Sequence, residues 1–346
     1  IKLIFCILIQ TNHKATTLFQ SFTFIDNFEP SKIYTMKKIN ILLIICIVIT
    51  VANAAAIIYT HYFHPATSQS DGGIALPVDA PVNSDIFMPA TIDLAGETVP
   101  VHRRDVEEAL KKELIVNTYL HSHTTQILKN APRVFAIIEP ILKANNIPDD
   151  FKYLAVIESR LDPLIVSPAG AASTWQIMKA TGKELGLEIS NDIDERYHLE
   201  KSTQAAAQYL KRAYNKFGSW TLAAASYNAG TGFLLKQMKI QKEQNYYNLL
   251  LGEETERYVY RILALKQIMT HPEKYNFQVN ITYPAEPIET VAVDTTVKSW
   301  ADFAHQQGIT YKTLKRFNPW LRKPDLHNSK HKTYHIAIPK NKELYK

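Results

Sequence analysis

From Asp105 to Met269 the apolar residues recur at helical spacing, and this pattern limits most strongly what the chain can fold into. Residues typical of helix ends interrupt the pattern, such as Gly218 after a long helical stretch and Ser219 before a short one. After Tyr275 the pattern changes to short β-branched stretches that flank two short helical patterns. We therefore predict a mainly α-helical domain followed by a small β-α-α-β domain.

Capping residues and prolines predict where the individual helices begin and end. Asp105 is expected to cap the first helix, and Pro132 and Pro140 are expected to separate the helices that follow. Asp149-Asp150 is expected to open another helix, which Pro163 ends. Further helices are expected at residues 200–217 and 254–269, and strands at residues 290–293 and 334–339.

The composition excludes several classes of protein. Of the 346 residues 46% are hydrophobic and 21% are charged, which is typical of a folded globular chain. Both cysteines, Cys6 and Cys46, lie early in the chain, which excludes a disulfide framework, a cysteine nucleophile and a thiolate zinc site from everything after residue 46. The net charge of +6 is concentrated in residues 296–346, which hold 11 Lys/Arg against 3 Asp/Glu. This distribution favours a basic C-terminal module that meets an anionic surface, and we expect no nucleic-acid partner.

The N-terminal region contains a candidate membrane segment. Lys37-Lys38 precede a run from Ile39 to Tyr59 that has no charged side chain. Such a segment enters a bilayer with its N-terminus in the cytoplasm. We therefore expect Met36 to be the true start, which places residues 1–35 outside the protein.

Residues 36–60 are then either a signal peptide or a membrane anchor. Ala52-Asn53-Ala54 fits a cleavage site, whereas the length of the apolar run favours an uncleaved anchor. Residues 61–85 are rich in Pro, Ser, Ala and Gly and are expected to form a linker. In both cases the remainder of the chain is exported, so we expect it in the cell envelope, in the periplasm.

One acidic residue lies on the face of a predicted helix that should point into the core. Glu158 shares its stripe with Phe151, Leu154 and Ala155 at positions i, i+3, i+4 and i+7. A carboxyl removed from water keeps its proton at higher pH, as a general acid requires. The alternative is a structural glutamate paired with an arginine, for which Arg160 is a nearby candidate, or with backbone donors.

Four ordered motifs extend from this glutamate over about a hundred residues: Glu158-Ser159; Ser167-Pro168-Ala169-Gly170-Ala171 with Trp175-Gln176-Ile177-Met178; Ala224-Ala225-Ser226-Tyr227-Asn228-Ala229-Gly230; and Glu254-Thr255 with Tyr258. Together they resemble the catalytic domain of lytic murein transglycosylases of the soluble-lytic-transglycosylase type, close to the membrane-bound D group, with a goose-type lysozyme-like fold. The resemblance covers residues 86–277. Residues 288–340 are similar to a LysM module, with Val293-Asp294-Thr295 in place of the usual Gly-Asp-Thr.

The resemblance implies a lyase that cuts peptidoglycan. Glu158 would protonate the glycosidic oxygen between N-acetylmuramic acid and N-acetylglucosamine and then accept the proton of the muramic 6-hydroxyl, which gives 1,6-anhydromuramyl ends. No cofactor or metal is implied, and the partners would be the glycan strands and, through the N-terminal segment, the membrane. We expect a monomer. The substrate-binding residues that the motifs imply are Ser159, Gln176, Tyr227, Asn228 and Tyr258.

Other interpretations remain open from the sequence. Asp162 is the nearest second carboxylate that a hydrolytic muramidase would need, although a turn role before Pro163 is favoured. Without the other motifs, Tyr227 to Gly230 would be read as a helix end, Tyr258 as core and Trp175 as packing.

Two positions depart from the family pattern. Ser173 stands where the family commonly has Gly, and Thr174 where a larger apolar residue is usual. If that position needs a left-handed backbone, Ser173 costs about 1 kcal/mol or more. An inactive glycan-binding or scaffolding protein therefore remains the alternative from another functional class.

Overall fold

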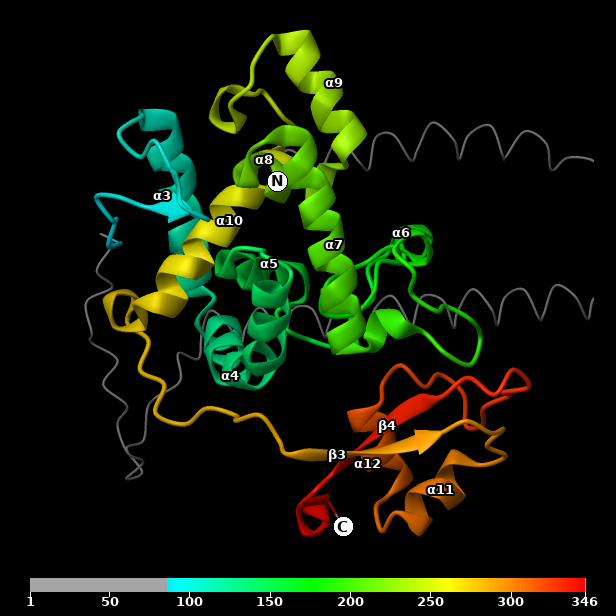
Figure 1. Ribbon diagram of the computed structural model, residues 1–346. Helices are drawn as coiled ribbons and strands as arrows, with labels where there is room; N and C mark the ends of the chain where they lie inside the picture. The colour runs from blue at the N-terminus through cyan, green and yellow to red at the C-terminus, as the bar shows by residue number, and fades with distance from the viewer. Residues whose placement is uncertain (1–85, 346) are drawn as a thin grey trace, which may run out of the picture. The chain divides into compact units, whose positions relative to one another are not determined.

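The structure is a computed structural model that describes residues 86–345 (Figure 1). The predicted start at Met36, the signal or anchor at residues 36–60 and the linker at residues 61–85 lie outside the described residues. Among residues 86–345 no helix is both long enough and apolar enough to cross a membrane.

The helical domain (residues 86–277) begins with a small antiparallel hairpin that the sequence analysis did not predict. Strand β1 (Asp93–Leu94) pairs with β2 (Glu97–Thr98) through a turn in which both central residues, Ala95 and Gly96, have positive φ. The helices that follow are α3 (Arg104–Tyr119), α4 (His121–Ala144), α5 (Lys152–Ser159), α6 (Lys179–Glu184), α7 (Leu199–Phe217), α8 (Trp220–Ala229), α9 (Thr231–Gln241) and α10 (Glu253–Thr270). Short 3₁₀ helices span Asp149–Phe151, Glu195–Tyr197, Tyr246–Asn248 and Pro272–Tyr275.

Most predicted helix boundaries are confirmed. Gly218, with φ of 66°, follows α7, and the Ser219 hydroxyl accepts a hydrogen bond from the Leu222 amide at the start of α8. The helical segment opened by Asp149-Asp150 ends at Arg160 and Leu161, whose φ angles of 54° and 61° are left-handed, just before Pro163.

The predicted roles of three residues were wrong. Pro132 and Pro140 both lie inside the single helix α4, because each proline removes only one backbone donor from a helix that its neighbours keep in place. Asp105 lies in the first turn of α3 and does not cap it; its carboxylate accepts hydrogen bonds from Arg103. Helices α6 and α9 were not predicted.

The last helix organises the core of the helical domain. α10 packs against α3, α5 and α8, and its buried residues include Tyr258, Val259, Ile262 and Leu263. The helices that contact α10 include those that carry the first and third sequence motifs. α10 therefore brings together residues from distant parts of the chain (Figure 1).

The C-terminal domain (residues 288–340) has the predicted β-α-α-β order. Strand β3 (Ile288–Val293) pairs antiparallel with β4 (Tyr334–Pro339), and α11 (Trp300–Gln306) and α12 (Tyr311–Phe317) lie between them in the sequence. Its buried core includes Trp300, Leu314, Ile336 and Ile338. The mainly helical first domain and the β-α-α-β second domain are thus confirmed.

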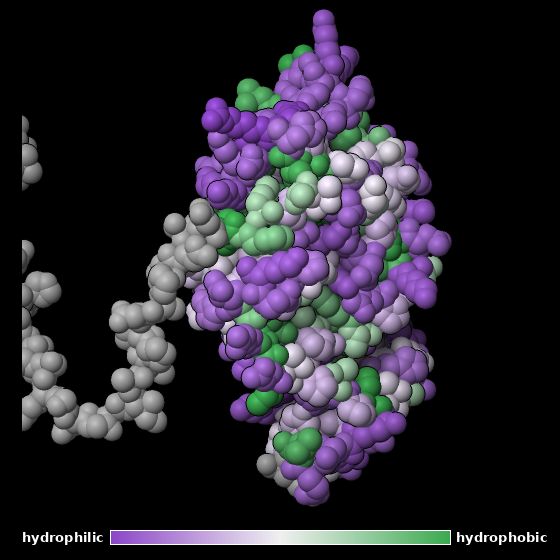
Figure 2. Space-filling model, turned by 90° about the vertical axis from the view of Figure 1, so that its left-hand side faces the viewer, coloured by the Kyte–Doolittle hydropathy of each residue, from purple (hydrophilic) through white to green (hydrophobic). Residues whose placement is uncertain are grey.

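On the face shown in Figure 2, hydrophobic side chains form separate patches among mainly hydrophilic residues. Three exposed hydrophobic side chains, Leu164, Val166 and Met178, lie close together in the sequence, around the second motif.

Candidate active site

Glu158 lies in the last turn of α5, and its side chain is partly exposed. The Tyr258 hydroxyl, which comes from α10, donates a hydrogen bond to Glu158 Oε1. Tyr258 is only 3% exposed, and burial raises the pKa of its hydroxyl well above the usual value. Tyr258 therefore remains a neutral donor that holds the Glu158 carboxyl in one orientation.

The surroundings of Glu158 favour its protonated form. Burial raises the pKa of Glu158 to about 7, although the Tyr258 hydrogen bond acts in the opposite direction by stabilising the carboxylate. The negative charge of Glu254 raises this pKa further, and the positive charge of Arg261 lowers it. Glu158 can thus hold and release a proton near neutral pH, as a general acid and base must.

The neighbouring residue, Ser159, holds a loop in place. Its side chain is 1% exposed, and its hydroxyl is within hydrogen-bond distance of the carbonyl oxygens of Ala155 (3.1 Å) and Thr174 (2.9 Å). Thr174 belongs to the segment from Ile165 to Met178, which we call the 165–178 loop. Ser159 was predicted to bind substrate; in this position its hydroxyl connects α5 to the 165–178 loop.

The 165–178 loop has an unusual backbone at two motif positions. Ser173 and Gln176 have φ angles of 67° and 46°, so Ser173 does occupy the left-handed region for which Gly is suited. Gln176 Nε2 donates to the carbonyl oxygens of Ser173 (2.8 Å) and Ile165 (3.2 Å), which closes the loop on itself. Trp175 is fully buried and donates to Thr203 Oγ1 (2.8 Å), which agrees with the packing role that the sequence left open as its alternative.

Tyr227 and Asn228 lie in the last turn of α8, which ends at Ala229 before Gly230. The Tyr227 hydroxyl donates to the Trp175 carbonyl oxygen (2.8 Å), so it also holds the 165–178 loop. The Asn228 side chain connects α8 to α10: its Oδ1 accepts from Thr255 Oγ1 (2.9 Å), and its Nδ2 lies 3.3 Å from Glu254 Oε1. The motif residues therefore come together from α5, the 165–178 loop, α8 and α10.

A glutamate outside the motifs caps α8. The Glu97 carboxylate, from β2, accepts hydrogen bonds from the Thr221 amide (2.9 Å), the Thr221 hydroxyl (2.6 Å) and the Trp220 amide (2.5 Å). A negative charge at this end of a helix also interacts favourably with the helix dipole. Glu97 lies more than a hundred residues before α8, and no local sequence pattern could have identified this role.

Two sequence-based expectations about partners of Glu158 can be compared with the structure. Arg160 was a candidate partner, but it is exposed at the end of α5, where its backbone is left-handed. The hydrogen-bond partner of Glu158 is instead Tyr258. Asp162 is exposed, and its Oδ1 accepts from the Leu164 amide (2.8 Å), which is the turn role that the sequence favoured. The carboxylate whose charge acts on Glu158 is Glu254, which stands in the fourth motif but was not given this role.

Cavities and metal-binding groups do not mark the site. One cavity, of about 570 Å³, is lined in part by Glu195, and another, of about 630 Å³, in part by Glu188. Lys332 of the C-terminal domain lines both cavities. Glu158 lines neither of them. Within residues 86–345 no three His, Cys, Asp or Glu side chains are grouped so that they could hold a metal ion.

Two families match the two domains. Residues 135–250 match the transglycosylase SLT domain, and residues 289–342 match the soluble lytic transglycosylase C-terminal LysM-like domain. Residues 135–250 are thus similar to SLT domains, and residues 289–342 are similar to LysM-like domains. The SLT match contains Glu158, the 165–178 loop and Tyr227, whereas Glu97 and Tyr258 lie outside it. The physical unit that forms the site is therefore longer than the matched SLT segment.

Similar proteins carry transglycosylase names. The membrane-bound lytic murein transglycosylase D of Escherichia coli K12 is 32% identical over 222 residues, which are 63% of this chain and 48% of that protein. The membrane-bound lytic murein transglycosylase F of Yersinia enterocolitica is 27% identical over 141 residues, 38% of this chain and 28% of that protein. This chain thus spans about half the length of its Escherichia coli relative. Among solved structures, the Escherichia coli 70 kDa soluble lytic transglycosylase matches 43% of this chain and 26% of its own, with 21% identity and a TM-score of 0.36.

Proposed function

We propose that this chain is a peptidoglycan lytic transglycosylase. It cleaves the β-1,4 bond between N-acetylmuramic acid and N-acetylglucosamine and leaves 1,6-anhydromuramyl ends. The observation that carries the proposal is the partly exposed Glu158 in an SLT domain, with a pKa of about 7 and a buried tyrosine that holds its carboxyl. The names of the similar proteins support the same reaction.

In the first step, protonated Glu158 donates its proton to the glycosidic oxygen as the bond to C1 of the muramic acid breaks. In the second, the Glu158 carboxylate accepts the proton of the muramic 6-hydroxyl while that oxygen attacks C1 of the same sugar. One carboxyl thus serves both steps and is regenerated with its proton, and no water is consumed. The Tyr258 hydrogen bond stabilises the carboxylate formed between them.

Gln176, Tyr227 and Asn228 would shape the sugar-binding surface around Glu158. All three side chains are partly exposed, and the hydrogen bonds described above fix their positions. The side-chain amides of Gln176 and Asn228 suit the N-acetyl groups of the sugars, because each amide can donate and accept a hydrogen bond. The exposed Leu164, Val166 and Met178 side chains would offer apolar contacts beside them.

The remaining parts of the chain would place the enzyme on its substrate. The LysM-like domain and its surplus of positive charge would hold glycan strands, and the N-terminal segment would attach the chain to the membrane or direct its export. The site of action would be the cell envelope, in the periplasm. Attachment can be checked by fractionation: a chain that starts at Met36 should appear with membranes, and one that starts at Ser84 should not.

The reaction is tested by mass analysis of the products released from purified sacculi. Glu158→Gln keeps the shape of the side chain but cannot donate a proton, so anhydro ends should disappear while the protein stays folded. Asp162→Asn is the matched control, since its carboxylate closes a turn, and it should keep most of the activity. Reducing ends in the wild-type products would instead identify a hydrolytic muramidase, and the absence of new ends would identify a glycan-binding protein.

A further inference from the structure

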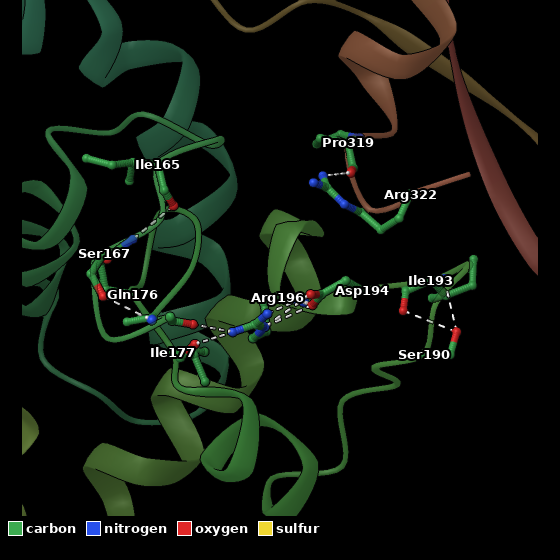
Figure 3. Close-up of polar contacts among 12 residues, drawn as sticks. Ile165, Ser167, Gln176, Ile177, Ser190, Ile193, Asp194, Arg196, Pro319 and Arg322 are labelled. Atoms are coloured by element: carbon green, nitrogen blue, oxygen red, sulfur yellow. Dashed lines mark hydrogen bonds and ion pairs between the residues drawn. The ribbon is translucent and has the colours of Figure 1, made fainter. Parts of the chain in front are cut away.

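One buried arginine joins the 165–178 loop to the segment that contacts the C-terminal domain. Arg196 is 8% exposed, and its Nη1 donates to the carbonyl oxygens of Gly170 (2.9 Å) and Ile177 (3.1 Å), both within the loop (Figure 3). Its Nε and Nη2 donate to the Asp194 carboxylate at 3.0 and 2.7 Å. Because the guanidinium is a rigid planar fork, it fixes the two loop carbonyl oxygens and the Asp194 carboxylate relative to one another.

Backbone pairing then connects this segment to the C-terminal domain. Ile193 and Leu321 form an antiparallel β-bridge, and the Asp194 amide donates to the Trp320 carbonyl oxygen (2.9 Å). Backbone hydrogen bonds of this kind have a definite register, unlike the side-chain contacts of two domains that merely touch. Asp194 thus contacts Arg196 with its side chain and the C-terminal domain with its backbone.

The hydrophobic core of the C-terminal domain extends to the same two segments. Ala172, Ile193 and Tyr197 of the helical domain are each at most 6% exposed and belong to the buried cluster of the C-terminal domain. Ala172 is itself a residue of the 165–178 loop. The loop is therefore connected to the C-terminal domain through this cluster, to which Ala172 belongs, and through Arg196.

The segment between the two domains is attached to α4 at Tyr283 and Glu286. The Tyr283 amide donates to the Lys129 carbonyl oxygen (2.8 Å), and the Arg133 guanidinium lies 5.4 Å from the centre of the Tyr283 ring. Arg133 also forms an ion pair with Glu286 at 3.7 Å. Residues 278–287 therefore follow α4 on their way to β3 (Figure 1).

We propose that the C-terminal domain is a fixed part of the catalytic unit. In this proposal Arg196 is a positioning residue: it connects the segment on which the C-terminal domain docks to the 165–178 loop. This inference rests on the proposed function. Hydrogen bonds from Ser159 and Tyr227 hold the other side of the loop, next to Glu158. Loss of docking would let the loop shift relative to Glu158 and would slow the reaction even on small substrates. A tethered module would affect only the reaction on the polymer, because it acts through local concentration.

The test uses the full chain and soluble glycan oligomers as substrate. Arg196→Lys keeps the positive charge but removes the planar guanidinium with its several donors. Ile193→Ala reduces the hydrophobic contact with the C-terminal domain. Arg103→Lys is the matched control, because Arg103 also bonds a carboxylate and a carbonyl oxygen, those of Asp105 and Tyr247. The measurements are kcat and KM on the oligomers and the indole N–H resonances of the four tryptophans, of which Trp175 reports on the loop.

In both variants we expect kcat on soluble oligomers to fall by about tenfold or more with KM nearly unchanged, and the Trp175 resonance to shift. The control should match the wild type in both. Should Arg196→Lys not fold, Ile193→Ala decides by the same two measurements. The proposal is overturned if kcat stays within about twofold of wild type and the Trp175 resonance does not move. If the wild type cuts no glycan, the proposed function fails, and the Trp175 resonance in Ile193→Ala still tests the docking.

Discussion

Tyr258→Phe removes the hydroxyl that donates to Glu158 and should move the pH dependence of the reaction to higher pH. The hydroxyl stabilises the ionised carboxylate, so its loss favours the protonated form. A hydrogen bond to a charged group contributes roughly 1.5–3 kcal/mol, and 1.36 kcal/mol corresponds to about one pKa unit. We take about one unit, because the ring stays in place and the carboxyl is partly exposed. The pKa of Glu158, about 7 in the wild type, should rise accordingly.

The assay is the profile of kcat/KM against pH on soluble glycan oligomers, which reports the protonation of the free enzyme. With a shift of one unit, the fraction of Glu158 that is protonated at pH 8 rises from about one tenth to about one half. The variant should therefore retain more of its maximal rate at pH 8 than the wild type does, although its maximum is expected to be lower.

The control is Tyr246→Phe, which removes a buried hydroxyl that donates to backbone carbonyl oxygens of α10. It should leave the alkaline midpoint of the profile unchanged. A midpoint for Tyr258→Phe that stays in place or moves to lower pH would show that Glu158 does not set this limb, and the assignment of the acid would be wrong.

Three further variants test the site through stability. Ser173→Gly should raise the free energy of unfolding by about 1 kcal/mol, because glycine adopts the left-handed φ of 67° without strain. Calorimetry measures this gain in stability, and a melting temperature below that of the wild type would contradict the prediction. The raised pKa of Glu158 means that the wild type loses stability as pH rises from 4.5 to about 7. Glu158→Gln should thus be more stable than wild type at pH 8, by at most about 3 kcal/mol, and equal to it at pH 4; equal urea midpoints at pH 8 would refute this. Glu97→Ala should cost about 2 kcal/mol and speed hydrogen exchange at Trp220 and Thr221, whereas unchanged exchange would contradict the capping role.

Local patterns in the sequence predicted most of the fold. The helix ends at Gly218 and Ser219 were predictable because each depends on the conformation or hydroxyl of one residue. Pro132 and Pro140 were misread because the packing of α4 outweighs the loss of two backbone hydrogen bonds. Helices α6 and α9 were missed, since α6 has six residues and α9 buries only Leu234 and Met238.

The site residues that belong to the sequence motifs were predictable, whereas those outside the motifs were not. The helical spacing indicated that Glu158 points inward, and the fourth motif included Tyr258, but the periodicity alone could not distinguish Tyr258 from Arg160 as its partner. The role of Glu97 was out of reach because it depends on a contact between residues that lie far apart in the sequence. The same holds for Arg196, whose loop partners Gly170 and Ile177 lie 26 and 19 residues before it in the sequence.

The contact between Glu158 and Tyr258 joins residues that are 100 positions apart in the chain. On the ribosome, Glu158 is therefore made well before the helix that buries it, and until α10 arrives it is an ordinary solvated carboxylate that ionises far below pH 7. The order of synthesis thus delays the appearance of the acid until the last helix of the domain has been made and has packed. A growing or truncated chain that lacks α10 carries the Glu158-Ser159 motif without the buried tyrosine that holds its carboxyl.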